Sequence, residues 1–300
     1  MKRKLIYLIL ILLYIFLIYY FFNFQTSINT KRIDDIGSIN LYFCQQTNCA
    51  NILVELINNS KDIKCAFYDL GEPTVLNALN KTNTLIFNEN YEGNFTPVTS
   101  KGLMHHKFCV FDEKIVLTGS WNPTIRGTYY NDNLVLLIVS KEISKAYLNE
   151  YNKLLKNKKH QANYLFNLSG NLIDLCFSPE GNCESLIINE IKKAKKQIKF
   201  LTFTFTSQKI AEAILNQNIS HSGVIEKTKI SQYTVKLNYT LDTNKYNMHH
   251  KSFIIDEDVV ILGSYNPTQS ANTQNDENLL VIRSIKLNEL MKKEFERIYN

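Results

Sequence analysis

The sequence predicts an α/β protein made of two similar halves in tandem, preceded by one transmembrane helix. Three observations lead to this fold class: a charge-free apolar run near the N-terminus, a set of sequence blocks repeated about 140 residues apart, and alternating strand and helix patterns within each repeat. A chain of 300 residues has room for two domains of about 150 residues. Apolar residues make up 45% and charged residues 21%, as in globular rather than disordered or collagen-like proteins.

The N-terminus carries the most apolar segment of the chain. Residues 5–22 contain only Leu, Ile, Tyr and Phe, close to the roughly 20 residues that a helix needs to cross a bilayer. A cleaved signal peptide is the alternative, but no small-residue cleavage pattern follows the run. The basic residues Lys2, Arg3 and Lys4 should remain in the cytoplasm. We therefore predict that residues 1–30 form a single-pass membrane anchor and its flanks, with the N-terminus cytoplasmic and the catalytic body extracytoplasmic.

Net charge gives little indication of the partner. The formal charge is +6, but three of the 34 basic residues precede the apolar run, and no charged residue follows them before residue 31. The rest of the chain therefore carries a net charge of only +3. An excess of this size does not by itself identify an anionic partner such as nucleic acid.

The cysteines suit an oxidising compartment. Cys44 and Cys49 bracket one short polar loop, and Cys176 and Cys183 bracket another, without the spacing of a metal knuckle. We expect two local disulfides, Cys44–Cys49 and Cys176–Cys183. Two cysteines remain in apolar strand-like runs, and they form either a third bridge or two buried free thiols. These are Cys65 and Cys109.

An internal repeat defines the domain organisation. In each half a cysteine-containing segment is followed by a helical pattern, an apolar strand and a second helix. The matched segments are residues 41–49 and 175–183, 63–70 and 198–205, and 72–80 and 208–217. Alternation of strand and helix predicts a layered α/β architecture in each half. We expect the halves to span residues 37–157 and 172–300.

The repeat is clearest in three motifs of polar residues. M-H-H-K-F-C-V-F-D at 104–112 matches M-H-H-K-S-F-I-I-D at 248–256, and G-S-W-N-P-T at 119–124 matches G-S-Y-N-P-T at 263–268. N-D-N-L at 131–134 matches D-E-N-L at 276–279. This last alignment places Asp132 opposite Glu277. A single H-x-K pair is an ordinary surface feature, but the whole set in the same order twice indicates a functional site.

These residue types suit attack on a phosphodiester. Alternate residues of a strand share a face, so the histidine and lysine of each H-x-K project together. Lysine and asparagine can stabilise charge on phosphate oxygens, while one histidine attacks phosphorus and a second protonates the leaving oxygen. Paired histidines could also suggest a metal, but the neighbouring lysines disfavour a cation, so we expect no metal and no cofactor.

The duplicated H-x-K-x4-D motif resembles the signature of the phospholipase D superfamily, from about residue 40 to residue 298. The motif context is most similar to phospholipase-D-like endonucleases and Zucchini-type nucleases, which generally carry one motif per chain. The resemblance implies two α/β/α halves related by a pseudo-twofold axis. It also implies one metal-independent site and a phosphohistidine intermediate. Because one chain supplies both motifs, no obligate dimer is needed.

The resemblance also implies roles for individual residues. His105 would be the nucleophile and His249 the general acid and base, with Glu277 orienting a motif histidine. Asp132 would stand at the matching position of the first half, one methylene shorter. The expected phosphate-binding residues are Lys107, Lys251, Asn122 and Asn266, supported by Ser120 and Ser264. Asp112 and Asp256 would be structural.

Three functions are compatible with the sequence. The motif context favours a membrane-anchored nuclease acting on DNA or RNA. The alternative is a phospholipase D or phosphatidyltransferase acting on phospholipid, for which an anchor would hold the site near its substrate. A non-catalytic module that binds nucleic acid or lipid is disfavoured because neither motif lacks its histidine or lysine.

Overall fold

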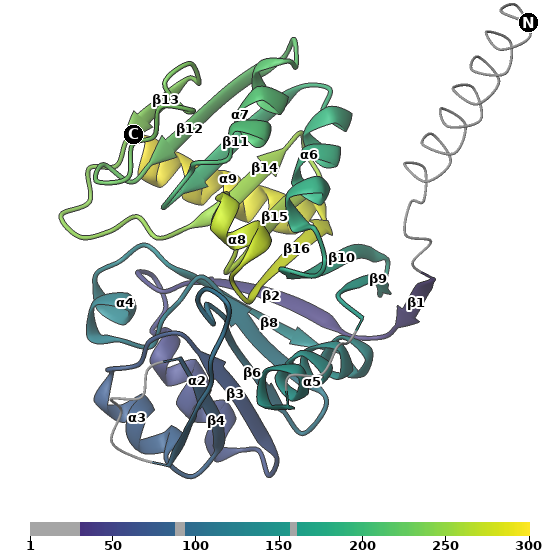
Figure 1. Ribbon diagram of the computed structural model, residues 1–300, viewed down its shortest axis with the longest axis vertical. Coiled ribbons are helices and arrows are strands. Elements are labelled where there is room, and N and C mark those ends of the chain that lie inside the picture. The colour runs from purple at the N-terminus through teal and green to yellow at the C-terminus, as the bar shows by residue number, and fades with distance from the viewer. Residues whose placement is uncertain (1–30, 88–93, 157–160) are drawn as a thin grey trace, which may run out of the picture. The chain divides into compact units, whose positions relative to one another are not determined.

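A computed structural model describes residues 31–87, 94–156 and 161–300 of the chain (Figure 1). The apolar run at 5–22, predicted to span a membrane, lies outside these residues. Among the described residues no helix is both long and apolar enough to cross a bilayer. Residues 32–300 form one compact unit.

The first half is a mixed sheet with helices on both faces. Its elements are β2 (Ser38–Phe43), α2 (Cys49–Asn58), β3 (Ile63–Phe67), α3 (Pro73–Leu79), β4 (Asn83–Ile86), β5 (Phe95–Pro97), β6 (Lys107–Phe111), β7 (Ile115–Gly119), α4 (Ile125–Tyr129), β8 (Leu134–Val139) and α5 (Lys141–Lys156). The strand order is β2-β8-β7-β6-β3-β4-β5. β6, β7 and β8 form an antiparallel meander, whereas β3, β4 and β5 run parallel.

The second half repeats this arrangement. Its elements are β9 (Asn163–Leu168), β10 (Asn171–Ser178), α6 (Cys183–Lys193), β11 (Gln197–Thr202), α7 (Gln208–Leu215), β12 (Ser220–Ile225), β13 (Tyr239–Leu241), β14 (Lys251–Ile255), β15 (Val259–Gly263), α8 (Gln269–Thr273), β16 (Glu277–Arg283) and α9 (Ile285–Tyr299). The strand order is β1-β9-β10-β16-β15-β14-β11-β12-β13. The α/β duplication predicted from the sequence is confirmed.

One strand from before the first half joins the sheet of the second. β1 (Arg32–Asp35) pairs in parallel with β9, and β9 pairs with β10 through a tight turn at Ser169 and Gly170. Gly170 has φ of +91°, a conformation that glycine adopts without steric cost. The described part of the segment between the expected halves, residues 161–171, therefore contributes a strand to the second sheet.

Both halves share one hydrophobic core. The central cluster combines side chains from both sheets with the buried faces of the long helices α5 and α9, including Tyr147 and Met291. Each of the other two clusters belongs to one half and packs under its helix pair, α2 with α3 or α6 with α7. Burial of this shared apolar surface holds the two motif-bearing sheets together.

Strand register relates the halves residue by residue. Gly119 pairs with Val135 across β7 and β8, and Gly263 pairs with Leu279 across β15 and β16. Both members of the second pair lie 144 positions after those of the first. The same offset separates the two H-x-K motifs, so no insertion intervenes between the motif histidines and β8 or β16.

This register corrects one predicted equivalence. The counterpart of Glu277 is Asn133, and the counterpart of Asp132 is Asp276. Two reciprocal bridges between the halves, Met104 with Asp276 and Asp132 with Met248, show the same correspondence. The predicted alignment of Asp132 with Glu277 was wrong by one residue. It had matched Asn133-Leu134 with Asn278-Leu279, because both segments contain an Asn-Leu pair.

All six cysteines form disulfides. Cys44–Cys49 and Cys176–Cys183 are bridged as predicted. The remaining two, whose state the sequence left open, form a third bridge between the paired strands β3 and β6. There are therefore no free thiols.

Candidate active site

His105 is oriented by a residue from the opposite half. It lies just before β6 and is 7% exposed. Its Nδ1 is 2.7 Å from Oε2 of Glu277, the first residue of β16. With Nδ1 donating to this carboxylate, neutral His105 presents the lone pair of Nε2 to substrate.

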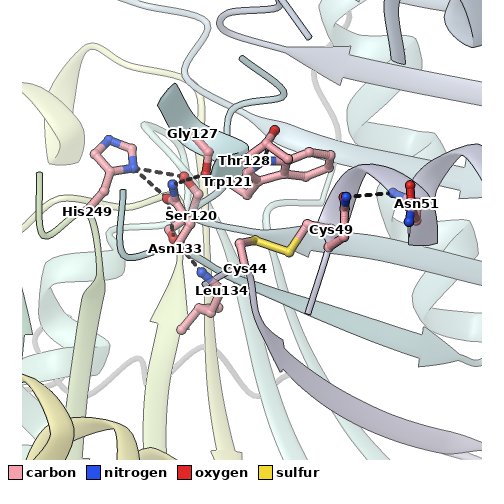
Figure 2. Close-up of a disulfide and its surroundings, with 11 residues drawn as sticks. Cys44, Cys49, Asn51, Ser120, Trp121, Gly127, Thr128, Asn133, Leu134 and His249 are labelled. Carbon is pink, nitrogen blue, oxygen red and sulfur yellow. Dashed lines mark hydrogen bonds between the residues drawn. A yellow bond between two sulfur atoms is a disulfide. The ribbon is translucent and has the colours of Figure 1, made fainter. Parts of the chain in front are cut away.

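His249 is held in the same way but by an amide (Figure 2). Its Nδ1 donates to Oδ1 of Asn133 at 2.8 Å and to the backbone oxygen of Ser120 at 3.1 Å. Asn133 is itself fixed, because its Nδ2 donates to the backbone oxygen of Gly127. Both acceptors require a proton on Nδ1, so Nε2 is again the nitrogen open to chemistry. One histidine therefore has a carboxylate behind it and the other a neutral amide.

Burial and nearby cations keep both imidazoles neutral. Desolvation lowers the pKa of His105 and of His249 well below the usual value, and the charges of Lys107 and Lys251 lower both further. The hydrogen bonds that cross between the halves, from His105 to Glu277 and from His249 to Asn133, join both motifs in one site. Neutral imidazole is the form required of a nucleophile.

The two lysines are buried cations poised for an anion. Each is 2% exposed, and each Nζ donates to the backbone oxygen of the histidine two residues earlier, at 2.6 Å for Lys107 and 2.7 Å for Lys251. Burial lowers the pKa of Lys107 to about 7, although Glu277 and Asp69 act in the opposite direction. Burial and the charge of Lys107 lower the pKa of Lys251 as well. A bound phosphodiester would supply the anion that both ammonium groups favour.

Glu277 lies within the same desolvated environment. Its side chain is fully buried, and burial raises its pKa to about 7 against the opposing effects of Lys107 and hydrogen bonds from Ser264 and Asn275. Burial thus disfavours the carboxylate more than Lys107 and these hydrogen bonds stabilise it.

The asparagines of the two G-S-x-N segments retain unused hydrogen-bonding capacity. Oδ1 of Asn122 and Oδ1 of Asn266 are both buried without a hydrogen-bond partner. Buried polar atoms are nearly always paired, so the matched pair of free acceptors sets these two residues apart. An amide oxygen cannot donate to a phosphate oxygen, so contact with phosphate would use the Nδ2 groups, and the phosphate-binding role stays a prediction.

The two serines instead support the groups that orient the histidines. Ser120 and Ser264 are fully buried. The hydroxyl of Ser120 donates to Asn133 at 3.0 Å, and that of Ser264 bonds Glu277. These contacts do not support the predicted supporting role in phosphate binding, because each hydroxyl is already used behind an imidazole.

The acids that close the H-x-K-x4-D motifs are structural, as predicted. Asp112 accepts hydrogen bonds from the backbone of Lys61 and Asp62, both at 2.8 Å. Asp256 accepts equivalent bonds from residues 195–197. Both acids fix the loop that leads into the neighbouring antiparallel strand, β3 or β11, and neither contacts a motif histidine.

Asp132 does not orient a histidine through its side chain. Its carboxylate binds Arg297 and Nδ2 of Asn244. The predicted orienting role belongs instead to Asn133. The two motifs are therefore unequal in charge, because the residue behind His249 is neutral.

Two aromatic residues at the site were not singled out from the sequence. The ring of Tyr68 lies 4.9 Å from that of His105, and the ring of Phe203 lies 4.7 Å from that of His249. Lys107 lies over Tyr68 at 5.1 Å, and Lys251 lies over Phe203 at 5.2 Å. Tyr68 directly follows the last residue of β3, and Phe203 directly follows the last residue of β11. This matched position in the two halves is the sequence signal that could have identified them.

No part of the described chain brings three or more histidine, cysteine or acidic side chains into a metal-binding cluster. The expectation that catalysis needs no metal stays a prediction, and it is tested below with a chelator.

Comparison with known proteins identifies the family. The model of the family described as "Cardiolipin synthase, PLD-like domain" matches residues 45–155 and 187–299. These two matches cover most of the chain and one falls in each half. The chain therefore belongs to the phospholipase D superfamily and is a phosphodiesterase of that superfamily.

Individual relatives are similar over different lengths. A phospholipase D of Rickettsia prowazekii is 26% identical over 196 residues, which cover 62% of this chain and 89% of the relative. A mitochondrial cardiolipin hydrolase of Xenopus tropicalis is 46% identical over 55 residues, which cover 18% and 26% of the two chains. The phosphatidylserine synthase of Haemophilus influenzae superposes with a TM-score of 0.60 at 12% identity, covering 86% of this chain and 85% of that one. This last likeness shows a shared fold and does not determine the substrate.

Replacement of Glu277 by glutamine should lower kcat by about 10²-fold or more, because an amide cannot stabilise the imidazolium character that develops on His105. Steady-state kinetics with bis(p-nitrophenyl) phosphate measures the loss. Asp112→Asn is the matched control, since it neutralises a motif acid that does not contact the histidines, and it should leave kcat within about threefold. Equal losses in both variants would contradict the role assigned to Glu277.

The activity of the free enzyme should fall as pH rises through about 7. The pKa of Lys107 is lowered to about 7, so its ammonium charge is present below that pH and lost above it. We expect kcat/KM to decrease by about tenfold per pH unit on this alkaline limb. A pH profile of kcat/KM from pH 5 to 9 tests this expectation, and a constant value from pH 7 to 9 would contradict it.

Proposed function

We propose that this phosphodiesterase is a membrane-anchored nuclease that cleaves DNA or RNA through a phosphohistidine intermediate. The proposal rests on the two inequivalent imidazoles, the buried lysines beside them and the aromatic side chains that flank both. The anchor and the extracytoplasmic location are inferred from the sequence of residues 1–30. The three disulfides support an oxidising compartment.

In the first step His105 acts as the nucleophile. His249 is neutral in the free enzyme, and the bound phosphodiester anion favours its protonated form. Nε2 of His105 then attacks phosphorus, the bond from phosphorus to the leaving oxygen breaks, and Nε2–H of protonated His249 gives its proton to that oxygen. The Glu277 carboxylate stabilises the positive charge that forms on the His105 ring. No carboxylate backs His249, which favours proton release from that ring. This asymmetry supports the assignment of roles.

In the second step water removes the phosphoryl group. Neutral His249 takes a proton from water, the oxygen attacks phosphorus, and the bond from phosphorus to Nε2 of His105 breaks. The ammonium groups of Lys107 and Lys251 stabilise the charge on the non-bridging oxygens in both steps, with the amides of Asn122 and Asn266 as further donors.

The choice of nucleic acid rests on two aromatic side chains that each lie next to a lysine. They are Tyr68 beside Lys107 and Phe203 beside Lys251. Tyr68 stacks on Phe87 with ring centroids 5.8 Å apart, and it is only partly buried. In the second half, Nζ of Lys229 also lies over Phe203, 5.7 Å from the ring centroid. Aromatic faces next to cations bind single-stranded nucleic acid by stacking on bases while lysine contacts the backbone.

Hydrolysis or transfer of phospholipid is the second candidate. Three aliphatic side chains are exposed between β12 and β14, namely Ile230, Val235 and Leu241 at 54%, 62% and 41%. Exposed apolar side chains of this kind can insert into a lipid surface. The names of the relatives, phospholipase D and cardiolipin hydrolase, also favour a lipid substrate.

A direct comparison of substrates tests the proposal. One preparation is assayed in EDTA with single-stranded DNA, RNA and phosphatidylcholine vesicles, beside His105→Ala and His249→Ala. We expect cleavage of at least one nucleic acid with the chelator present, and a loss of at least about 10²-fold in each variant because each removes one of two essential imidazoles. Vesicle cleavage without nucleic-acid cleavage would establish the second candidate. Activity that EDTA abolishes, or that survives both substitutions, would contradict the mechanism.

A further inference from the structure

The second histidine of each motif is not used in the chemistry described above. His106 and His250 directly follow the catalytic histidines and are completely buried. Nε2 of His106 is 2.9 Å from Glu150 on α5, and Nε2 of His250 is 3.0 Å from Glu294 on α9. Buried, ionisable groups without a catalytic task require another explanation.

A closed series of contacts, which we call an ionic ring, links His106 back to His105. Glu150 pairs with Lys153 one turn later on α5, at 3.5 Å, and Lys153 pairs with Asp276 of the opposite half. The backbone oxygen of Asp276 accepts the backbone N–H of His105 at 2.9 Å. The ring thus runs from the motif through its own long helix to the other half and back.

The second half contains the same ring. Glu294 pairs with Arg297 one turn later on α9, at 2.7 Å, and Arg297 pairs with Asp132 of the first half. The backbone oxygen of Asp132 accepts the backbone N–H of His249 at 2.9 Å. His249, His250, Glu294 and Arg297 each lie 144 positions after their counterparts in the first ring, and Asp132 lies 144 positions before Asp276, so the arrangement recurs with the fold.

The rings determine where the orienting groups stand. Asp276 immediately precedes Glu277, and Asp132 immediately precedes Asn133. A ring that fixes the acid therefore fixes both the backbone of the catalytic histidine and the side chain behind its imidazole. This explains why Asp132 binds Arg297 rather than a histidine.

The charged forms of one acid and one base in the rings are favoured by their partners. Burial would raise the pKa of Glu294, but hydrogen bonds from Arg297 and His250 outweigh it and lower the pKa to about 2. The acids around Lys153, Glu150 first, raise its pKa despite the opposing effect of burial. The contacts within the rings thus favour the charged forms of Glu294 and Lys153.

We propose that Glu150 with Lys153, and Glu294 with Arg297, are positioning residues for the reaction. Each pair holds the acidic segment of the opposite half so that Glu277 or Asn133 meets its imidazole. The proposal needs only the phosphodiesterase activity, and it is independent of whether the natural substrate is nucleic acid or lipid.

A stabilising role alone would make different predictions. Loss of a buried ion-pair partner would lower the free energy of unfolding, yet leave kcat unchanged in the molecules that remain folded. A positioning role requires a loss of kcat in the folded population, because small displacements of reacting groups cost up to about 10²-fold in rate.

The two rings supply their own conservative substitutions, since one uses lysine where the other uses arginine. Lys153→Met, Lys153→Arg and the control Lys156→Met are compared with bis(p-nitrophenyl) phosphate at a temperature where denaturant titration shows each to be folded. Lys156 is exposed on the same helix and lies outside the ring. We expect Lys153→Met to lower kcat by about 10- to 100-fold with KM changed less than about threefold. Lys153→Arg and Lys156→Met should stay within about threefold of the original enzyme.

A spectroscopic readout separates positioning from stability. The Nδ1 proton shared by His105 and Glu277 should give a downfield proton resonance, which Lys153→Met should shift and Lys156→Met should not. Where Lys153→Met fails to fold, Glu150→Gln takes its place, with the same expected loss of kcat and shift. An unchanged kcat in folded Lys153→Met or Glu150→Gln would overturn the proposal, as would an equal loss of kcat in Lys156→Met.

Discussion

The site depends on one constraint, that neither motif histidine is oriented by its own half. Glu277 reaches His105 from the second half, and Asn133 reaches His249 from the first. Duplication supplies two H-x-K units, but it produces a working pair only when the sheets are packed so that each completes the other. The shared core around α5 and α9 provides that packing, so stability of the interface and competence of the site are linked.

Burial gives the site its electrostatic character. Two lysines and a glutamate are taken out of water, and the pKa values of Lys107 and Glu277 both move to about 7. Such charges are costly without compensation, and a phosphodiester provides a compact anion that supplies it. The same burial keeps both imidazoles neutral until substrate is bound. Substrate binding and activation of the histidines are therefore expected to be coupled.

Much of this arrangement could be predicted from the sequence, because the residues that make chemical bonds recur in fixed order. The H-x-K pairs and the two local disulfides follow from spacing within one half, and the structural role of Asp112 and Asp256 follows from the resemblance to the phospholipase D superfamily. Contacts between separate strands or between the halves cannot be predicted in this way. Strand register decides that Asn133 rather than Asp132 orients His249. The bridge from Cys65 to Cys109 depends on which strands are neighbours. Each ionic ring joins three separate segments, which no local pattern reveals.

The central claim is that one imidazole forms the covalent bond and the other transfers protons. Trapping the intermediate tests it most directly. In His249→Asn an activated aryl ester such as bis(p-nitrophenyl) phosphate can lose its leaving group without an acid, while removal of the phosphoryl group lacks its base and stalls. Rapid quenching into alkali followed by peptide mass spectrometry should find the adduct on His105. An adduct on His249 in the reciprocal His105→Asn variant, or none in either variant, would contradict the account.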